Sequence, residues 1–127
     1  MSCKITNHTQ IGLYTYVNDA TTTSAELSEI IKYANQTALF MRIAEHPNIT
    51  PSLLRQLYEM DYTGKSVRTS YVYEVIANNK LTPRKVLQQL ANGSKGDESV
   101  ARAAKQTLHE IDAGIIDAPK RYVREPL

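Results

Sequence analysis

The sequence predicts an all-α protein in which about six helices pair into three stacked helical hairpins, a short α-solenoid. Three observations lead to this fold class: a phrase written twice between Ile43 and Leu90, helix start signals inside each copy, and apolar residues that recur with a helical period. Each hairpin of such an array buries only one face by itself. We therefore expect the three hairpins to stack and to close a common core.

The duplicated phrase contains an Ile-Ala pair, a Thr-Pro pair and a Leu-x-x-Leu motif. The first copy comprises Ile43-Ala44, Thr50-Pro51 and Leu54 to Leu57, and the second comprises Ile76-Ala77, Thr82-Pro83 and Leu87 to Leu90. The first and last landmarks are displaced equally, and we call this displacement, from Leu54 to Leu87, the repeat offset. The Thr-Pro pairs are displaced slightly less. Such a nearly constant displacement is typical of helical repeats. The stretch from Leu27 to Ile30 matches the same register one hairpin earlier.

Length, charge and cysteine content favour a single small domain. A chain of 127 residues has room for one core, so we treat residues 1–127 as one helical-repeat domain. The net charge of +2 is too small to require a polyanionic partner. The single cysteine, Cys3, cannot form an intrachain disulfide, which is typical of the reducing cytoplasm. No apolar run approaches the roughly 18 residues of a membrane span, so we expect a cytoplasmic protein with no membrane partner.

The N-terminal residues 1–23 differ from the rest because they are rich in Thr, Asn and Tyr and show no helical period. We expect an irregular N-terminal arm here, either an ordered extended segment or a short helical lead-in. Three helix pairs are then expected over residues 24–113. The first helix carries an apolar face from Leu27 to Ala34. The second spans about 36–46, because the residue before Pro47 is pushed out of the α region.

Two Thr-Pro pairs mark the starts of the third and fifth helices. Threonine is a favourable N-cap, and proline fits the first helical position because its missing N–H has no helical partner there. We therefore predict helices that start at Thr50 and at Thr82. The fourth helix should follow Ser66, and the sixth should begin near Asp97, whose carboxylate suits the positive end of the helix dipole. Residues 114–127 are expected to be a C-terminal tail.

The stretch Ile-Ala-Glu-His-Pro-Asn-Ile-Thr-Pro from Ile43 to Pro51, followed by Leu53-Leu54 and Leu57, resembles the repeat of the leucine-rich repeat variant family. The resemblance covers residues 39–91, although the second copy has Lys80 where a proline would stand. It implies a right-handed superhelix akin to the HEAT and armadillo arrays, which mostly bind other macromolecules. It carries over no catalytic residue.

No group of residues in the sequence is typical of a catalytic or metal site. His8, His46 and His109 are scattered, and no second His or Cys stands at metal-ligand spacing. The loop 93–97 lacks the strand and the spacing of a nucleotide-binding motif, so we interpret it as an interhelix loop, with a phosphate-binding backbone nest as the alternative. We expect no enzyme activity, no cofactor and no metal.

Positive charge is concentrated between residues 65 and 105, where eight Lys or Arg residues stand against three acidic residues. A helical surface with this balance could bind the phosphates of a nucleic acid such as DNA, or it could be an ordinary solvated surface. For the nucleic-acid alternative, the candidate binding residues are Arg68, Lys80, Arg84, Lys85, Lys95, Arg102 and Lys105.

Tyrosine is the other unusual component, with eight copies against one phenylalanine and no tryptophan. Most of these side chains should be half-buried, but we predict that Tyr73 is exposed because it lies two positions from an inward-facing Tyr71. Exposed tyrosines favour a protein partner. The leading hypothesis is therefore a small non-enzymatic interaction module with Arg55, Gln56 and Tyr73 as protein-binding residues. The sequence does not predict the partner, the oligomeric state or the helix layer that binds.

Overall fold

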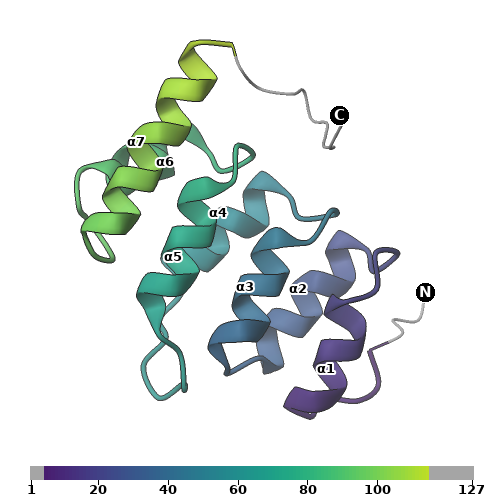
Figure 1. Cartoon of the computed structure of the whole chain (residues 1–127). Helices are drawn as coiled ribbons and strands as arrows, with labels where there is room; N and C mark the ends of the chain where they lie inside the picture. Colours follow the sequence, from purple (N-terminus) through teal and green to yellow (C-terminus); the bar gives the residue numbers. More distant parts are fainter. Residues whose placement is uncertain (1–4, 115–127) are drawn as a thin grey trace.

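The computed structural model describes residues 5–114, and every regular element within them is an α-helix (Figure 1). The predicted all-α class is confirmed. The described chain forms seven helices: α1 (Gln10–Val17), α2 (Ser24–Tyr33), α3 (Thr37–Glu45), α4 (Pro51–Glu59), α5 (Thr69–Asn78), α6 (Arg84–Ala91) and α7 (Glu98–Asp112). Cys3, on which the cytoplasmic expectation rests, and residues 115–127 of the expected tail lie outside the described residues.

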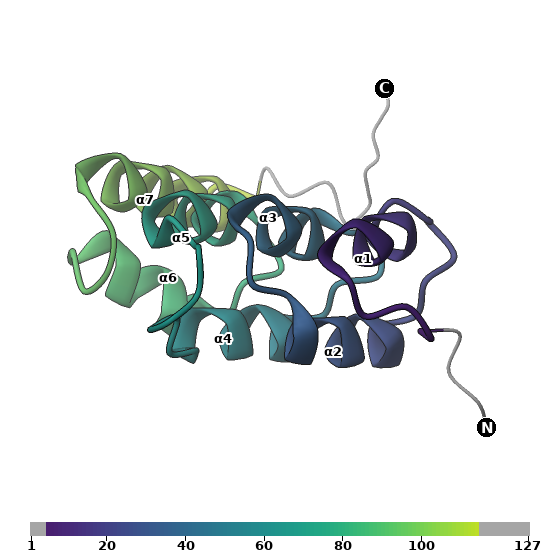
Figure 2. The same ribbon diagram turned by 90° about the horizontal axis from the view of Figure 1, so that it is seen from below.

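The helices form two layers that face each other across the core (Figure 2). Helices α1, α3, α5 and α7 follow one another in one layer, and α2, α4 and α6 follow one another in the other. Within the first layer, α3 packs against α5 and α5 packs against α7. Each helix therefore buries the side that faces the opposite layer and leaves its other side in solvent.

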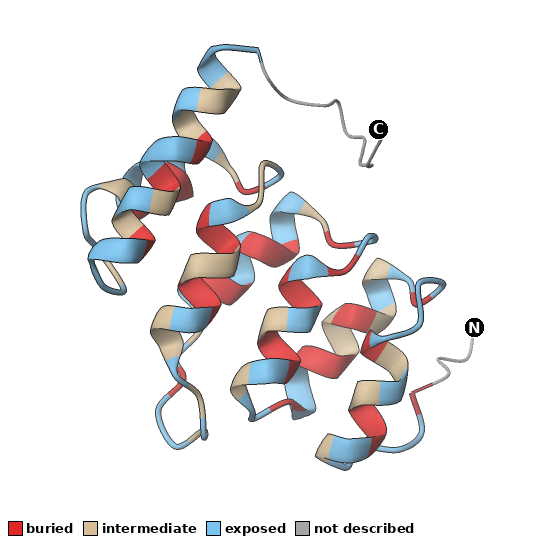
Figure 3. Ribbon diagram, in the orientation of Figure 1, coloured by how far each residue is buried: buried red, intermediate tan, exposed pale blue. Residues whose placement is uncertain are grey.

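The core is built from the apolar faces that the helical period predicts (Figure 3). The first and last residues of the three matching motifs are all 0% exposed: Leu27, Ile30, Leu54, Leu57, Leu87 and Leu90. Complete burial of one such side chain contributes about 1.5–3 kcal/mol. Equal burial at equivalent positions agrees with the register that the duplicated phrase predicts.

Residues 10–17 are helical, so of the two alternatives for the N-terminal residues the structure shows the short helical lead-in in this stretch and not an extended segment. The hydroxyl of Thr9 caps α1 by accepting from the backbone N–H of Gly12 at 3.0 Å. Leu13 and Val17 are buried one turn apart, whereas Ile11 is 84% exposed. Because apolar residues lie on both sides of so short a helix, the sequence shows no helical period here.

The first Thr-Pro pair begins a helix as predicted. The hydroxyl of Thr50 accepts from the backbone N–H of Leu53 at 3.1 Å, and Pro51 is the first residue of α4. The start of α2 is capped in a similar way. Thr23 accepts from the N–H of Glu26 at 3.2 Å, and the Glu26 carboxylate accepts from the N–H of Thr23 at 2.8 Å.

The second Thr-Pro pair differs, and the predicted start at Thr82 is wrong. Helix α6 begins at Arg84, with Pro83 as its N-cap. The buried hydroxyl of Thr82 instead donates to the carbonyl oxygen of Ile76 at 2.7 Å. The repeat offset leads from Thr50 to Pro83, not to Thr82. Pro83 therefore takes the structural place of Thr50, and the two Thr-Pro pairs are not equivalent.

The loops from α1 to α2, from α3 to α4 and from α5 to α6 share one turn geometry. Asp19, His46 and Asn79 each accept with a side-chain atom from the backbone N–H two residues later, at 2.9, 3.0 and 2.9 Å. We call the three helix pairs joined by these turns, α1–α2, α3–α4 and α5–α6, units; the first unit spans residues 10–33.

Candidate interaction surfaces

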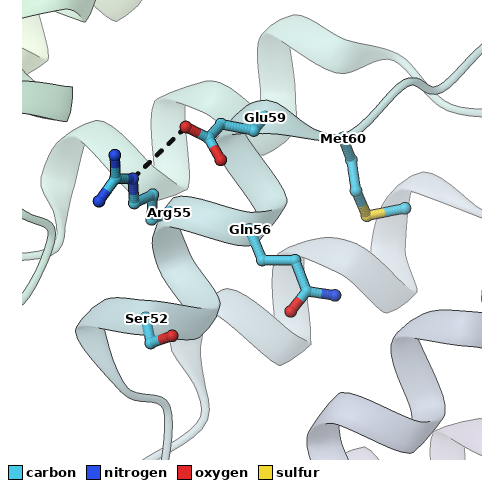
Figure 4. A pocket seen from close by; sticks show the side chains of 5 residues that line it. All are labelled: Ser52, Arg55, Gln56, Glu59 and Met60. Atoms are coloured by element: carbon cyan, nitrogen blue, oxygen red, sulfur yellow. Dashed lines mark hydrogen bonds and ion pairs between the residues drawn. The ribbon is translucent and has the colours of Figure 1, made fainter.

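The outward side of α4 carries two of the three predicted protein-binding residues. Arg55 and Gln56 are exposed because the flanking Leu54 and Leu57 turn the opposite side of the helix toward the core. They contribute to an open hollow of about 400 Å³ (Figure 4). The hollow is lined by Ser52, Arg55, Gln56, Glu59 and Met60.

The charge of Arg55 is balanced within this hollow. Its Nε lies 3.4 Å from Oε2 of Glu59 one helical turn later, and the two side chains are 61% and 60% exposed. An ion pair this exposed contributes about 0–1 kcal/mol, so either side chain can exchange its partner for a bound molecule at little cost. The hollow therefore has no net charge, and its lining is both polar and apolar, with Met60 as the apolar side chain.

Helix α6 repeats the outward pattern of α4 at the repeat offset. Lys85, Gln88 and Gln89 are exposed and stand at the places of Ser52, Arg55 and Gln56. These six residues form what we call the α4–α6 outer face. The side-chain amides of Gln56, Gln88 and Gln89 form no hydrogen bond within residues 5–114. Sequence reasoning selected Gln56 but not its counterparts on α6, which the repeat offset identifies.

Tyr73 is buried, so the prediction that it is exposed is wrong. Only 7% of its surface is accessible, whereas Tyr71 is 47% exposed. At the repeat offset, Tyr73 takes the place of the fully buried Phe40, and Tyr71 takes the place of the exposed Ala38. A comparison of residues at the repeat offset therefore predicts that Tyr73 is buried and that Tyr71 is exposed.

Tyr73 belongs to an aromatic cluster between α4 and α5. Its ring centre lies 6.2 Å from that of Tyr58 and 6.3 Å from that of Tyr62, both edge to face. The Tyr62 ring contacts Phe40 at 5.2 Å, and its hydroxyl donates to the carbonyl oxygen of Leu57 at 2.6 Å. Burial raises the pKa of Tyr73, and the neighbouring Tyr58 adds to the shift. These observations assign Tyr73 to the core rather than to a binding surface.

Lys95, a candidate nucleic-acid-binding residue, is bound to the protein itself. Its Nζ donates to the carbonyl oxygen of Tyr58 at 2.6 Å and lies 4.5 Å from the centre of the Tyr58 ring. Lys65 forms the same kind of contact one unit earlier, where its Nζ donates to the carbonyl oxygen of Ala34 at 3.1 Å. A cation at a helix C-terminus complements the helix dipole. Both lysines thus tie the end of a helix to the following unit.

Three more of the candidate cations form ion pairs. Lys80 lies 3.2 Å from Glu110, Arg84 lies 2.5 Å from Asp112, and Arg102 lies 3.6 Å from Glu98. Glu110 and Asp112 stand just beyond residue 105, where the sequence-based charge count ends. Over residues 65–112 the balance is eight cations against five carboxylates. The basic surface is therefore less positive than the sequence indicates.

The remaining candidates for nucleic-acid binding are Arg68, Lys85 and Lys105. The guanidinium carbon of Arg68 lies 5.8 Å from the centre of the exposed Tyr71 ring, within reach of a cation–π contact. Lys85 and Lys105 are exposed and form no ion pair or hydrogen bond with another described residue. They stand on α6 and α7, which belong to opposite layers (Figure 2). The seven candidate cations therefore come from both helix layers and from the loops between the helices.

The histidines and the loop before α7 have contacts of their own. His8 stacks on Tyr33 with ring centres 3.8 Å apart, and His46 is buried in the turn before α4. At the start of α7, the Asp97 carboxylate accepts from two backbone N–H groups, at the place considered for a phosphate. Among residues 5–114, no group of three or more His, Cys, Asp or Glu side chains could hold a metal ion. No helix in the same range combines the length and apolarity needed to cross a membrane.

The observations define a class of protein, an all-α protein of two packed helix layers. No protein-family model, curated protein or solved structure matches this chain. The resemblance to the leucine-rich repeat variant family stays a prediction.

Proposed function

We propose that this protein is a small non-enzymatic interaction module, a short α-solenoid that binds a protein partner through the α4–α6 outer face. The observation that carries the proposal is the row of exposed side chains at equivalent places on α4 and α6, with three glutamine amides that have no partner among the described residues. The contacts that recur from unit to unit support the solenoid arrangement. The resemblance to leucine-rich repeat variants supports a right-handed superhelix.

The chemistry of this face suits a polypeptide. A glutamine amide both donates and accepts hydrogen bonds, as a peptide group does. Helices α4 and α6 follow one another in the same layer (Figure 2), so their outward side chains lie on the same side of the molecule. Gln56 on α4 and Gln89 on α6 could therefore bind one continuous segment of a partner.

Charge favours a protein over a nucleic acid at this face. Arg55 is paired with Glu59, which leaves Lys85 as the one other charged residue among the six. Nucleic-acid affinity depends mainly on cations that neutralise phosphates. The nucleic-acid alternative would therefore rest first on Arg68, Lys85 and Lys105, because the other four candidate cations already contact carboxylates or Tyr58.

Affinity capture from the native host tests the proposal with three forms of the protein. These are the wild type, a Gln56→Ala/Gln89→Ala variant, and a Gln106→Ala control that removes an exposed amide from α7 in the opposite layer. We expect one protein to be captured by the wild type and the control and to bind the double variant about tenfold or more weakly, because two hydrogen bonds are lost. A partner that binds all three equally would contradict the proposed face.

A nucleic-acid complex would have a different signature. Three phosphate contacts would weaken binding about 40-fold between about 50 and about 200 mM salt, because each contact releases counterions. Binding to a DNA duplex is measured for the wild type and for an Arg68→Ala/Lys85→Ala/Lys105→Ala variant. A micromolar, salt-sensitive complex that disappears in the triple variant would favour the alternative function.

A further inference from the structure

Helices α1, α3 and α5 begin along one edge of the molecule, and the chain segments around these starts form one surface (Figure 1). The segments are residues 5–11, 33–38 and 62–71, and we call their surface the α1–α5 edge. It shares no residue with the α4–α6 outer face. The α1–α5 edge is therefore a separate candidate for binding, and it does not depend on the proposed function.

Hydrogen bonds hold the three segments side by side. The side-chain amide of Gln10 donates to the carbonyl oxygen of Tyr33 at 2.8 Å and accepts from the backbone N–H of Asn35 at 2.8 Å. On the other side of residues 33–38, the backbone N–H of Ser66 donates to the carbonyl oxygen of Asn35 at 3.1 Å. A backbone that is fixed before a partner arrives lowers the entropy cost of binding.

The α1–α5 edge carries most of the large apolar side chains that reach solvent. Among residues 5–114, four such side chains are exposed, and three of them belong to this edge: Ile11 at 84%, Tyr33 at 39% and Tyr71 at 47%. Single exposed apolar side chains are ordinary on a protein surface. Here they are concentrated in about a fifth of the described residues, as is typical of an interaction surface.

Both exposed tyrosine rings have a neighbour that holds them. The ring of Tyr33 stacks on that of His8 with the ring centres 3.8 Å apart. The guanidinium carbon of Arg68 lies 5.8 Å from the centre of the Tyr71 ring, and the backbone N–H of Arg68 donates to the hydroxyl of Thr37 at 2.8 Å. Tyrosine and arginine are the side chains that often carry the binding energy of protein interfaces, so the edge has the composition of such a site.

The charge of the α1–α5 edge is positive. Its three segments contain Lys65 and Arg68 and no aspartate or glutamate. The Nζ of Lys65 donates to the carbonyl oxygen of Ala34 at 3.1 Å, whereas the guanidinium of Arg68 forms no hydrogen bond or ion pair within residues 5–114. Of the carboxylates that border the edge, that of Glu29 is paired with Lys32 at 3.1 Å. The Arg68 guanidinium can therefore bind a carboxylate of another molecule through two parallel hydrogen bonds.

We propose that the α1–α5 edge is a second protein-binding surface that takes an acidic segment of a partner. A carboxylate of the segment binds Arg68, and its apolar side chains pack against Ile11 and the two exposed tyrosines. Single-stranded nucleic acid also stacks on tyrosine rings, but it needs several cations along its backbone. Within the described residues, the edge offers one cation that is not already bound, which favours the acidic segment.

Selection from a random-peptide library displayed on phage tests the proposal without a known partner. The wild type is the target, and an Arg68→Gln/Tyr71→Ala variant removes the peptides that bind elsewhere. We expect the selected peptides to combine Asp or Glu with Leu, Ile, Phe or Tyr, because these residues supply the carboxylate and the apolar contacts. Selected peptides without carboxylates, or a selection that enriches no peptide, would overturn the proposal.

Fluorescence anisotropy then measures the binding of a selected peptide to single variants at exposed positions. Arg68→Gln and Tyr71→Ala should each weaken binding about tenfold or more. Lys85→Gln removes an exposed cation from α6 and should change binding less than about twofold, because a distant exposed charge is screened by salt. Equal losses in Arg68→Gln and Lys85→Gln would show general charge attraction and would contradict a site at Arg68. Circular dichroism checks that all variants keep their helices.

Two further measurements in the same assay separate the alternatives. The Gln56→Ala/Gln89→Ala variant should bind the selected peptide as the wild type does, and a loss of binding would assign the peptide to the α4–α6 outer face instead. Labelled oligouridine and oligothymidine should bind more weakly than the peptide. A salt-sensitive oligonucleotide complex that disappears in the Arg68→Gln/Tyr71→Ala variant would assign the edge to nucleic acid and would overturn the proposal.

Discussion

Tyr73 packs edge to face against Tyr58 and Tyr62, whereas Tyr71, two residues earlier, is 47% exposed. The two side chains are chemically identical, so their different roles follow from their positions in the repeat. A ring in the core loses its packing partners and leaves a cavity when it is truncated, but a ring on the surface does not. At the scale of single residues, the position in the repeat therefore decides what a side chain contributes.

This difference predicts the cost of two alanine substitutions. Tyr73→Ala should lower the free energy of unfolding by about 3–5 kcal/mol, the range for a buried aromatic ring. Tyr71→Ala should change it by less than about 1 kcal/mol, because only an exposed contact with Arg68 is lost. Urea denaturation measures both values. If Tyr71→Ala lowered the free energy of unfolding more than Tyr73→Ala does, the assignment of Tyr73 to the core would be wrong.

Tyr62 gives a prediction about alkaline pH. Burial first, and then the neighbouring Tyr73, raises the pKa of its hydroxyl above the ordinary value of about 10. The folded state keeps this hydroxyl neutral, while the unfolded chain ionises it, so stability falls as the pH rises above about 10. We expect Tyr62→Phe to lose stability less steeply in this range, as measured by urea midpoints. If Tyr62→Phe lost stability with rising pH as steeply as the wild type does, the loss could not be assigned to the Tyr62 hydroxyl.

At the scale of the element, helix ends are set partly by residues that belong to another unit. Lys65 reaches the end of α2 and Lys95 reaches the end of α4, both through a carbonyl oxygen. No local pattern predicts such contacts, since the partners stand 31 and 37 residues apart. From the sequence we assigned Lys95 to a binding surface because this residue lies in the positively charged stretch between residues 65 and 105.

The structural role of Lys95 is tested against a matched surface lysine. Lys95→Met should lower the free energy of unfolding by about 1–3 kcal/mol, because a charge-assisted hydrogen bond and a cation–π contact are lost. Lys85→Met should stay within about 0.5 kcal/mol of the wild type, since Lys85 is exposed. Thermal and urea denaturation of the two variants measure the difference. Equal stabilities would mean that Lys95 is an ordinary surface residue.

The six helices α2 to α7 could be predicted from the sequence because caps and the helical period act locally, as at Thr50 and Pro51. Helix α1 was predicted only as one of two alternatives, because it has only two turns and carries apolar residues on both sides. The predicted helix start at Thr82 was wrong for another reason. A Thr-Pro pair starts a helix only when the threonine hydroxyl accepts from a backbone N–H at the helix N-terminus, and the hydroxyl of Thr82 instead donates to the carbonyl oxygen of Ile76.

At the scale of the whole molecule, two layers of helices leave two outward surfaces. Of the seven basic residues predicted from local charge, Lys80 and Arg84 form ion pairs with carboxylates that lie far away in sequence, Glu110 and Asp112. The α4–α6 outer face was predicted in part, through Arg55 and Gln56. Its continuation on α6 required the repeat offset between the two copies of the duplicated phrase.

Site-specific photo-crosslinking tests the central claim most directly. A benzophenone amino acid replaces Gln56, Gln89 or, as a control on the opposite layer, Gln106, and each form is irradiated in an extract of the native host. We predict that positions 56 and 89 crosslink to the same protein and that position 106 does not, because both glutamines belong to one binding face. Crosslinks to nucleic acid at 56 and 89, or the same protein from all three positions, would contradict this account.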